Sequence, residues 1–426
     1  MPRVSSALAT RFARCVNTRF TRCENFVLCL CIVSEALADP VAYLTAGTVP
    51  GVFFTFRDSP ARRRALAAAP RSAERYQLFG LDQLASRGLV TRHNLERPKP
   101  PPLWARLAGG ALKRALEALG GYGGDFATVL ASVRIANRAD VVLSTVDTVG
   151  IPLMLVKRVG RLRPPLVYVA IGLPERLAQL RSRRMRGLYA SALESCAVVL
   201  AYSEKEVEDI RRWVAGQGAT VRAEFVPFGV DCGSFAPNGV AATDEVVSVG
   251  ADPHRDYELL VRVASRMPDV AFRIVTSADH ARALGSRPAN VALETNLPFE
   301  EMWKRLAAAR LVALPVRENS YSGATTVLLQ AMALEKPVVV TRTSAIATGY
   351  GLVDGENVRL VAPADDEGFE RALADVLRDN LHARALGVSA RATVERELSW
   401  ERYVDRLEEH LRDAAAAPAP SRSEPR

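Results

Sequence analysis

The chain has 426 residues, of which 49% are hydrophobic and 24% charged, with 27 Gly and 25 Pro. This composition excludes disordered and fibrous proteins and allows two domains that each bury their own core. The net charge of +9 is uneven: residues 1–236 carry 33 Lys/Arg against 19 Asp/Glu (+14), and the remainder 23 against 28 (−5). A basic first half fits anionic acceptors or a membrane surface, although an Arg-rich composition alone gives the same excess.

The first 39 residues predict a poorly ordered extension. Five arginines precede a short apolar run over 26–33, which resembles a secretion signal in outline, but Glu35 follows directly. No run of eighteen apolar residues predicts a membrane-spanning helix. The six cysteines and five histidines show no metal-ligand spacing, so we expect reduced thiols, no bound metal and a cytoplasmic protein.

From residue 40 short apolar runs alternate with helical patterns. A strand is expected at 41–44, followed by a turn-rich loop over 46–51, a helix over 76–86 and an amphipathic basic helix over 103–119. Further strands are expected at 89–91, 141–144, 166–170, 198–201 and 223–226. Buried strands separated by helices predict a parallel sheet, here in a first domain spanning 40–238.

The same alternation restarts in a second domain, 239–395. Its expected strands are 245–249, 270–276, 291–293, 311–314 and 338–341, and its expected helices include 256–267, 299–308 and 325–334. A C-terminal helix is predicted within 396–413 and a disordered tail over 414–426. The predicted fold class is α/β, with two Rossmann-like doubly wound domains facing each other across a cleft.

Two segments of the second domain suggest a phosphate site. Gly250 ends a strand, and Arg255 stands where the next helix begins, so free helix amides and a guanidinium could meet an anion. An ordinary strand-to-helix turn is the alternative.

The second segment follows the strand at 311–314 and leads into an apolar helix. Small and hydroxyl residues at a helix start are suited to a diphosphate, and Gln330 could meet a ribose hydroxyl. A Ser/Thr capping loop without a ligand is the alternative. The segment contains Glu318, Ser322, Gly323, Ala324, Thr325, Thr326 and Gln330.

Several motifs resemble the GT-B glycosyltransferases, specifically the retaining enzymes of family 4 (group 1). The run Val226–Asp231, followed by Phe235, resembles their inter-domain signature, and Gln330–Ala333 with Lys336–Val339 resembles their donor helix and the next strand. The resemblance covers about residues 40–412.

The resemblance implies transfer of a sugar from a nucleotide-diphosphate sugar to an acceptor hydroxyl, with retention and without a metal or other cofactor. The chain has no Asp-x-Asp motif, which agrees with metal independence. Arg255 and Glu318 are the implied catalytic residues. The implied donor-binding residues are Gly250, Arg255, Glu318, Ser322, Gly323, Ala324, Thr325, Thr326 and Gln330.

The chain departs from the family pattern at several positions. Two glutamates eight residues apart are replaced by Ser322 and Gln330, the usual Arg after the first glycine is Ala251, and the usual Gly before Lys336 is Glu335. Two alternatives therefore stay open: a catalytically silent GT-B scaffold that binds a nucleotide or a partner enzyme, and another GT-B chemistry such as sugar-nucleotide epimerisation.

The acceptor is open among polysaccharide, glycolipid and small metabolite. Basic clusters over 157–163 and 181–186 fit solvated helix faces or a peripheral contact with an anionic inner membrane face. No nucleic-acid module is recognised, so no nucleic-acid partner is expected.

Overall fold

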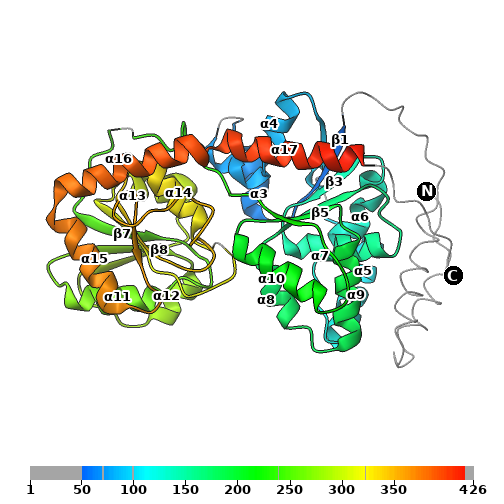
Figure 1. The fold of residues 1–426 in the computed structure, drawn as a ribbon, viewed down its shortest axis with the longest axis horizontal. Helices are drawn as coiled ribbons and strands as arrows, with labels where there is room; N and C mark the ends of the chain where they lie inside the picture. The colour runs from blue at the N-terminus through cyan, green and yellow to red at the C-terminus, as the bar shows by residue number, and fades with distance from the viewer. Residues whose placement is uncertain (1–49, 70–71, 98–99, 238, 322, 418–426) are drawn as a thin grey trace.

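The computed structural model describes residues 50–417 except 70–71, 98–99, 238 and 322. It contains two parallel six-stranded sheets that lie side by side along the molecule, each with helices on both faces (Figure 1). The predicted fold class, two doubly wound α/β units, is therefore confirmed. The extension predicted over 1–39 and the strand predicted at 41–44 lie outside the described residues.

The first sheet has the strand order β2-β1-β3-β4-β5-β6, and every neighbouring pair is parallel. Three of its strands, β3, β4 and β5, are buried at every position, which explains why they appear in the sequence as apolar runs without alternation. The strands are β1 (Gly51–Thr55), β2 (Val90–His93), β3 (Val141–Ser144), β4 (Leu166–Ala170), β5 (Val198–Ala201) and β6 (Ala223–Phe225).

Helices of the first half connect these strands. The α-helices are α3 (Pro60–Ala67), α4 (Leu81–Ser86), α5 (Leu103–Ala118), α6 (Phe126–Ala136), α7 (Asp147–Arg158), α8 (Leu173–Ala178), α9 (Arg183–Glu194) and α10 (Glu204–Ala215). Two 3₁₀ turns, η1 (Ala73–Leu78) and η2 (Asn94–Glu96), complete this half.

The second sheet has the order β12-β11-β10-β7-β8-β9 and is also parallel throughout. Its strands are β7 (Glu245–Val249), β8 (Ala271–Thr276), β9 (Val291–Thr295), β10 (Leu311–Leu314), β11 (Val338–Thr341) and β12 (Arg359–Val361). Its helices are α11 (Tyr257–Arg266), α12 (Ala278–Leu284), α13 (Phe299–Ala308), α14 (Thr325–Ala333), α15 (Asp366–Arg378) and α16 (Asn380–Glu397).

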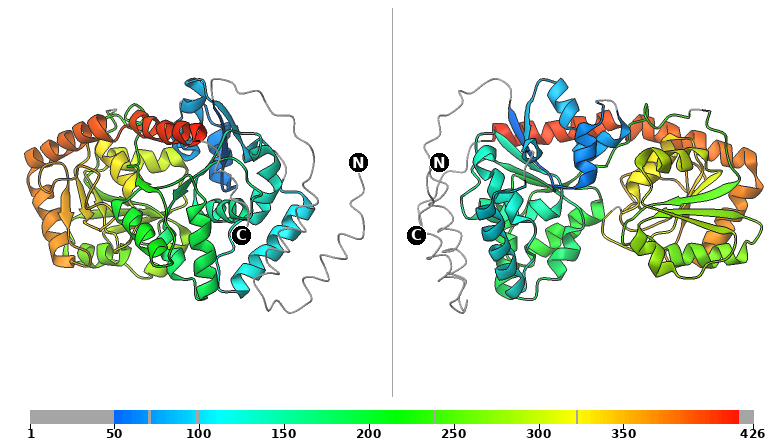
Figure 2. Two further views of the ribbon diagram at one scale, coloured as in Figure 1. Left: turned by 45° about the vertical axis from the view of Figure 1, so that its right-hand side comes forward. Right: turned by 180° about the vertical axis from the view of Figure 1, so that it is seen from behind.

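The last helix, α17 (Trp400–Ala416), belongs to the first half although the chain reaches it from the second (Figure 2). Its residues Val404, Leu407 and Leu411 are buried, and Glu408 forms an ion pair with Arg87 at 2.8 Å. The chain thus passes between the two halves twice, once before β7 and once before α17.

These two passages are bonded to each other. The amide of Val230 donates to the carbonyl of Leu398, and the amide of Trp400 donates back to Val230, both at 2.9 Å. One hydrophobic cluster extends from the first sheet through Phe228 and Tyr403 into the second sheet. We call these two passages the hinge. They are hydrogen-bonded to each other and packed into a hydrophobic cluster that both halves share.

The structure differs from the sequence prediction in four places. Residues 51–55 form the strand β1, which was not predicted and which begins at the last residue of the predicted turn-rich loop. The strand β12 was also not predicted. The helix predicted over 76–86 is divided into η1 and α4, because Phe79 and Gly80 both adopt left-handed backbone conformations. Finally, α17 continues to Ala416, beyond the predicted end at 413.

Candidate functional site

The strand order of the second sheet reverses between β7 and β10. Ligands of doubly wound sheets bind at such a reversal, beside the carboxyl ends of the strands. The loops that leave β7 and β10 are bonded to each other, since Asp256 donates its amide to the Pro315 carbonyl (3.0 Å) and Arg317 donates to the His254 carbonyl (2.8 Å). The structure therefore brings the two predicted segments together.

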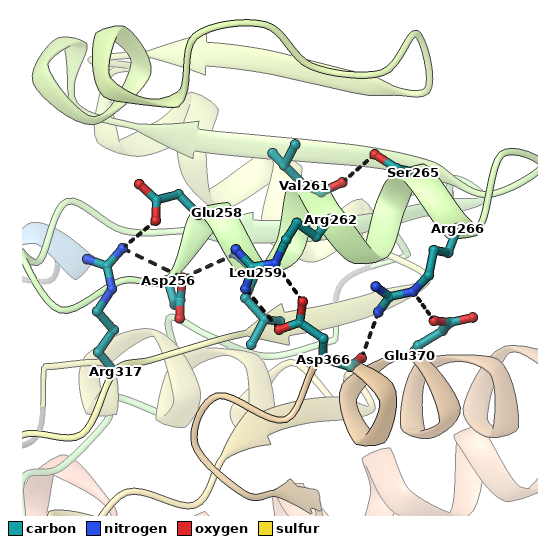
Figure 3. A network of polar contacts seen from close by, with 10 residues as sticks. All are labelled: Asp256, Glu258, Leu259, Val261, Arg262, Ser265, Arg266, Arg317, Asp366 and Glu370. Atoms are coloured by element: carbon teal, nitrogen blue, oxygen red, sulfur yellow. Dashed lines mark hydrogen bonds and ion pairs between the residues drawn. The ribbon is translucent and has the colours of Figure 1, made fainter.

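Ion pairs hold the beginning of α11 in place. The Arg317 guanidinium contacts Glu258 at 3.2 Å and Asp256 at 3.7 Å, as Figure 3 shows. Asp256 also caps α11 by accepting from the amide of Leu259. Two further pairs attach α11 to α15, namely Arg262–Asp366 and Arg266–Glu370. These contacts position the residue just before the helix, Arg255.

Arg255 is a buried cation that forms no ion pair with any of the described residues. Its side chain is 3% exposed, and one of its terminal nitrogens donates to the Val249 carbonyl at 2.6 Å. The other terminal nitrogen and Nε are buried and have no hydrogen-bond partner among the described residues. Burial lowers the pKa of Arg255. Because an unpaired buried charge is costly, this geometry calls for an anion.

The absence of a side chain at Gly250 leaves room for the Arg255 guanidinium. The φ of Gly250 is 150°, and a Cβ there would lie 2.5 Å from Arg255 Nε. Any other residue would be strained and would displace the guanidinium. The space over Gly250, expected to admit a ligand, is thus filled by the Arg255 side chain.

The Asp252 carboxylate lies against the glycine of the second segment. It accepts from the Tyr321 hydroxyl at 2.9 Å and from the His254 amide at 2.8 Å. A Cβ on Gly323 would lie only 2.6 Å from Asp252 Oδ1. Burial, followed by the negative charge of Asp252, raises the pKa of Tyr321. A negative side chain therefore stands where a diphosphate was expected.

The Glu318 side chain forms a hydrogen bond with the turn after β11. It is exposed, and its Oε1 accepts from the Ser344 amide at 2.9 Å, so the side chain ties the segment to the turn after β11. Ser322, the other predicted donor-binding residue of this loop, lies outside the described residues.

The N-terminus of α14 has no capping side chain. Ala324 is the residue before the helix and offers no acceptor, while Thr325 Oγ1 is buried and unpartnered within the described chain. Free amides at a helix start carry partial positive charge and bind anions. This feature and the Arg255 guanidinium provide two independent sources of positive potential in adjoining loops.

Thr326 and Gln330 lie on one face of α14 and line a cavity of about 300 Å³. Gln330 Oε1 is buried without a partner in the described part of the chain. Tyr76 of η1 and Phe235 of the first passage also line this cavity, which we call the hinge cavity. The predicted ribose residue therefore faces a space shared by both halves.

On the opposing side, two carboxyl groups are buried at the carboxyl end of the first sheet. Glu206 accepts from the amides of Gly172 (2.7 Å) and Leu173 (3.0 Å). Asp147 accepts from the Tyr168 hydroxyl at 2.8 Å. Burial raises the pKa of Asp147, and burial together with the nearby Asp147 charge raises the pKa of Glu206 to about 8.

The two halves contact each other at this level. The Tyr321 ring lies so close to Gly172 that a Cβ there would be 3.2 Å from the ring. His254 Nε2 is 3.4 Å from Glu175 Oε1, so the β7–α11 loop reaches α8. These contacts join the predicted donor loops to the first sheet's edge.

Sequence reasoning missed Asp252, Tyr321, Asp147 and Glu206. Asp252 and Tyr321 stand inside the motifs that were inspected, but their roles depend on side-chain contacts between loops. Asp147 and Glu206 lie next to strand ends in stretches that resembled ordinary helix starts.

Residues 245–379 match the sequence profile of a family described as "Glycosyl transferases group 1". This segment holds both donor loops and Arg255. The second half of the chain is therefore similar to the group 1 glycosyltransferases over 135 of the 426 residues.

Curated proteins that are similar to this chain include two named for GDP-mannose. A monoacylated alpha-(1-6)-phosphatidylinositol monomannoside mannosyltransferase of Corynebacterium glutamicum is 26% identical over 46% of this chain and 58% of its own. An MMP alpha-(1->4)-mannosyltransferase of Mycolicibacterium hassiacum is 27% identical over 41% of this chain and 44% of its own. A GDP-mannose-dependent alpha-(1-6)-phosphatidylinositol monomannoside mannosyltransferase of Mycolicibacterium smegmatis is 26% identical over 47% of this chain and 59% of its own. The chain thus matches about half the length of these relatives.

Solved structures share the fold across both halves of the chain. A sucrose-phosphate synthase of Thermosynechococcus elongatus aligns over 87% of this chain and 100% of its own, with a TM-score of 0.65 and 17% identity. Anabaena HepE in complex with UDP-glucose aligns over 85% and 100%, with a TM-score of 0.60 and 15% identity. These likenesses establish the GT-B fold.

Two further properties of the described residues concern metal binding and membrane spanning. No group of three or more His, Cys, Asp or Glu side chains is arranged to hold a metal ion. Within the same residues, every helix is too short or too polar to cross a membrane.

Proposed function

We propose that this protein transfers a sugar from a nucleotide-diphosphate sugar to an acceptor hydroxyl, with retention of the anomeric configuration. The observation that carries the proposal is the buried Arg255 guanidinium, two of whose nitrogens have no partner among the described residues. The start of α14, in the loop that Asp252 contacts, has no side-chain cap at Ala324. A diphosphate would supply the missing acceptors and charge.

Arg255 would act most strongly on the leaving group. As the glycosidic bond to the diphosphate breaks, negative charge grows on the phosphate oxygens, and a preorganised cation stabilises that state more than the ground state. The free amides at the start of α14 would add to the same effect. Contacts between the halves, such as Tyr321 on Gly172, would exclude water so that the acceptor hydroxyl attacks.

The nucleoside would reach the hinge cavity. Gln330 lines this cavity and has a buried amide oxygen without a partner among the described residues, and Thr326 and Tyr76 line the same cavity. An amide oxygen accepts from a ribose hydroxyl, so Gln330 would keep one contact that a glutamate makes at this position.

Asp252 must move before a donor can bind, because its carboxylate lies against Gly323. This observation also favours a second candidate, a silent GT-B scaffold in which Asp252 permanently occupies the phosphate corner. Replacement of both family glutamates, at Ser322 and Gln330, supports the same candidate. The scaffold would bind no diphosphate at this corner.

The names of the similar proteins suggest an acceptor class to test. Two of them are named for phosphatidylinositol mannoside acceptors, so a glycolipid acceptor is the first to test. The donors to test first are GDP-mannose, which appears in the name of a relative, and UDP-glucose, which is bound in a solved structure of similar fold.

The deciding experiment measures binding first and transfer second. Purified protein is titrated calorimetrically with GDP, UDP, GDP-mannose and UDP-glucose, and the donor that binds is then incubated with lipid, sugar and polysaccharide acceptors. Binding followed by an α-linked product supports the transferase. Absence of any diphosphate binding would sink both the transferase and Arg255 as a phosphate ligand, and it would favour the silent scaffold. Binding without product from any acceptor would contradict the transferase and would also show that Asp252 does not close the phosphate corner.

A further inference from the structure

Exposed apolar side chains gather at the beginning of α5. Seven large hydrophobic residues are exposed in the described chain, and three of them are Leu103 (67%), Trp104 (41%) and Leu107 (61%). Leu103 and Leu107 are four residues apart and therefore share one face of the helix. An exposed cluster of this kind marks a contact surface, because single exposed apolar residues are ordinary but grouped ones are not.

The helix that carries this cluster is held firmly. The opposite face of α5 is buried, and its Gly109 packs so closely on α6 that a Cβ there would lie 2.5 Å from the Ala127 amide nitrogen. The exposed cluster is therefore presented by a fixed helix, at the end of the molecule away from the second sheet (Figures 1 and 2).

A basic groove adjoins the cluster. It has a volume of about 300 Å³ between the start of α5 and the end of α6, and Trp104 is one of its walls. Arg97, Arg134 and Arg138 line it, and none of its lining residues is acidic. Arg97 and Arg138 form no ion pair within the described chain. The groove thus offers guanidinium groups beside an indole ring.

We propose that this surface, formed by the start of α5 and the groove, docks the protein on an anionic lipid bilayer. Leu103, Trp104 and Leu107 would enter the boundary between headgroups and acyl chains, where an aromatic ring with one polar edge is favoured. The arginines of the groove would bind lipid phosphate, for which a planar guanidinium is well suited.

A bilayer fits this surface better than a nucleic acid does. Phosphate backbones attract arginines, but they give no reason to expose two leucines beside them, whereas a membrane boundary uses both features. The proposal does not depend on the transferase reaction, although a lipid acceptor would make docking useful to it.

Vesicle co-sedimentation of the full chain tests the proposal. Phosphatidylcholine vesicles with and without roughly 30% phosphatidylglycerol are compared at about 0.15 M salt. We expect the chain to sediment with the anionic vesicles, and the apparent binding constant to fall at least about tenfold in Leu103→Ser/Leu107→Ser and in Arg97→Glu/Arg138→Glu. Fluorescence quenching by brominated lipid should be lost in Trp104→Tyr.

Matched controls separate docking from other effects. Leu381→Ser changes an equally exposed leucine (81%) on α16 of the second half and should leave vesicle binding unchanged. Arg255→Met should also keep vesicle binding, which makes failure here distinguishable from failure of the donor site. Unaltered melting temperatures show that the variants fold.

Three outcomes would overturn the proposal. They are no binding to anionic vesicles, equal binding by the wild type and both double variants, and binding of a single-stranded RNA probe at this surface in place of vesicles. Loss of binding in Leu381→Ser to the same extent would also contradict it.

Discussion

Arg255 combines a stability cost with a proposed function at one residue. Its guanidinium is buried with a single carbonyl partner, so the free protein holds a charge that the described residues leave uncompensated. Groups of this kind are retained where a ligand supplies the missing partner.

The variant Arg255→Met tests both the stability cost of this residue and its proposed role in catalysis. We expect turnover with the identified donor to fall by roughly two to three orders of magnitude, as for other electrostatic groups that act on a leaving oxyanion. The unliganded variant should be at least as stable as the wild type, since an apolar side chain of similar size replaces an unpaired buried charge. Steady-state kinetics and thermal melting measure the two effects.

The control for this variant is Arg282→Met, which removes an exposed arginine on α12, a helix that the proposed donor site does not use. It should leave turnover near the wild-type value. Normal turnover in Arg255→Met would show that another group stabilises the leaving phosphate.

Gly250 is expected to tolerate no side chain. In Gly250→Ala, the new Cβ would meet Arg255 Nε at 2.5 Å, at a backbone φ of 150°. We expect a loss of stability on the order of 1–3 kcal/mol and reduced nucleotide affinity. Gly218→Ala serves as a comparison, because its φ of 77° is also strained but no atom lies within 4 Å of the new Cβ. Equal nucleotide affinity in both variants would separate Gly250 from the donor site.

Asp252 should oppose the binding of a diphosphate. Its carboxylate borders Gly323, and a like charge a few ångströms from phosphate oxygens costs free energy. In Asp252→Asn, calorimetry should therefore show a nucleoside diphosphate binding about tenfold more tightly, while Asp279→Asn on α12 leaves the affinity unchanged. Weaker binding in Asp252→Asn would instead assign Asp252 a supporting role beside Arg255.

At the scale of elements, sequence patterns predicted the buried strands well and the exposed connections poorly. Runs such as 141–144 and 311–314 form strands because they are buried on both faces and need no partner-specific signal. The helix expected over 76–86 failed because its break depends on left-handed conformations at Phe79 and Gly80, which the helical periodicity does not show.

The candidate site was predictable only in its positions along the chain. Gly250, Arg255 and Thr325 stand at strand and helix ends, which the alternation of elements already indicates. The Asp252 contact with Gly323 and the Glu318 contact with Ser344 join separate loops, so they depend on the tertiary packing. Local spacing contains no information about such contacts.

The loop before α8 depends on a buried acid. The pKa of Glu206 is raised to about 8 from an ordinary value of 4.5, chiefly by burial. Because the folded state holds this proton more tightly, its contribution to stability is complete below pH 4.5 and is lost as the pH rises through about 8. Glu206→Gln keeps an acceptor for the Gly172 and Leu173 amides but cannot ionise.

We therefore expect the melting temperature of Glu206→Gln to fall less than that of the wild type between about pH 6 and about pH 9. Glu208→Gln, an exposed change on the same helix, should follow the wild-type profile. Parallel profiles for all three proteins would show that Glu206 titrates normally.

At the scale of the whole molecule, the hinge is the place where both halves depend on one close contact. Gly229 lies under the second passage, and a Cβ there would be 2.7 Å from the Ser399 carbonyl and 2.8 Å from Tyr403 Cβ. Val230 bonds to both sides of the same turn.

In Gly229→Ala these passages must separate. We expect a destabilisation on the order of 1–3 kcal/mol and a changed arrangement of the halves, measured by thermal unfolding and small-angle scattering. Gly233→Ala, nearby on the first passage with only Asp231 Oδ1 at 3.3 Å, should have a smaller effect. Equal effects from the two changes would mean that the two passages can move apart at Gly229 without loss of stability.

The return of α17 to the first half has a consequence for synthesis. Val404, Leu407 and Leu411 cover core residues whose own sequence lies more than 200 positions upstream. The half that is translated earlier therefore keeps an apolar surface open until α17 itself has been translated. The second unit, residues 245–361 with α15 and α16, needs no such late segment for its sheet and can mature earlier. A nascent chain stalled before residue 400 should therefore recruit chaperones through its older half.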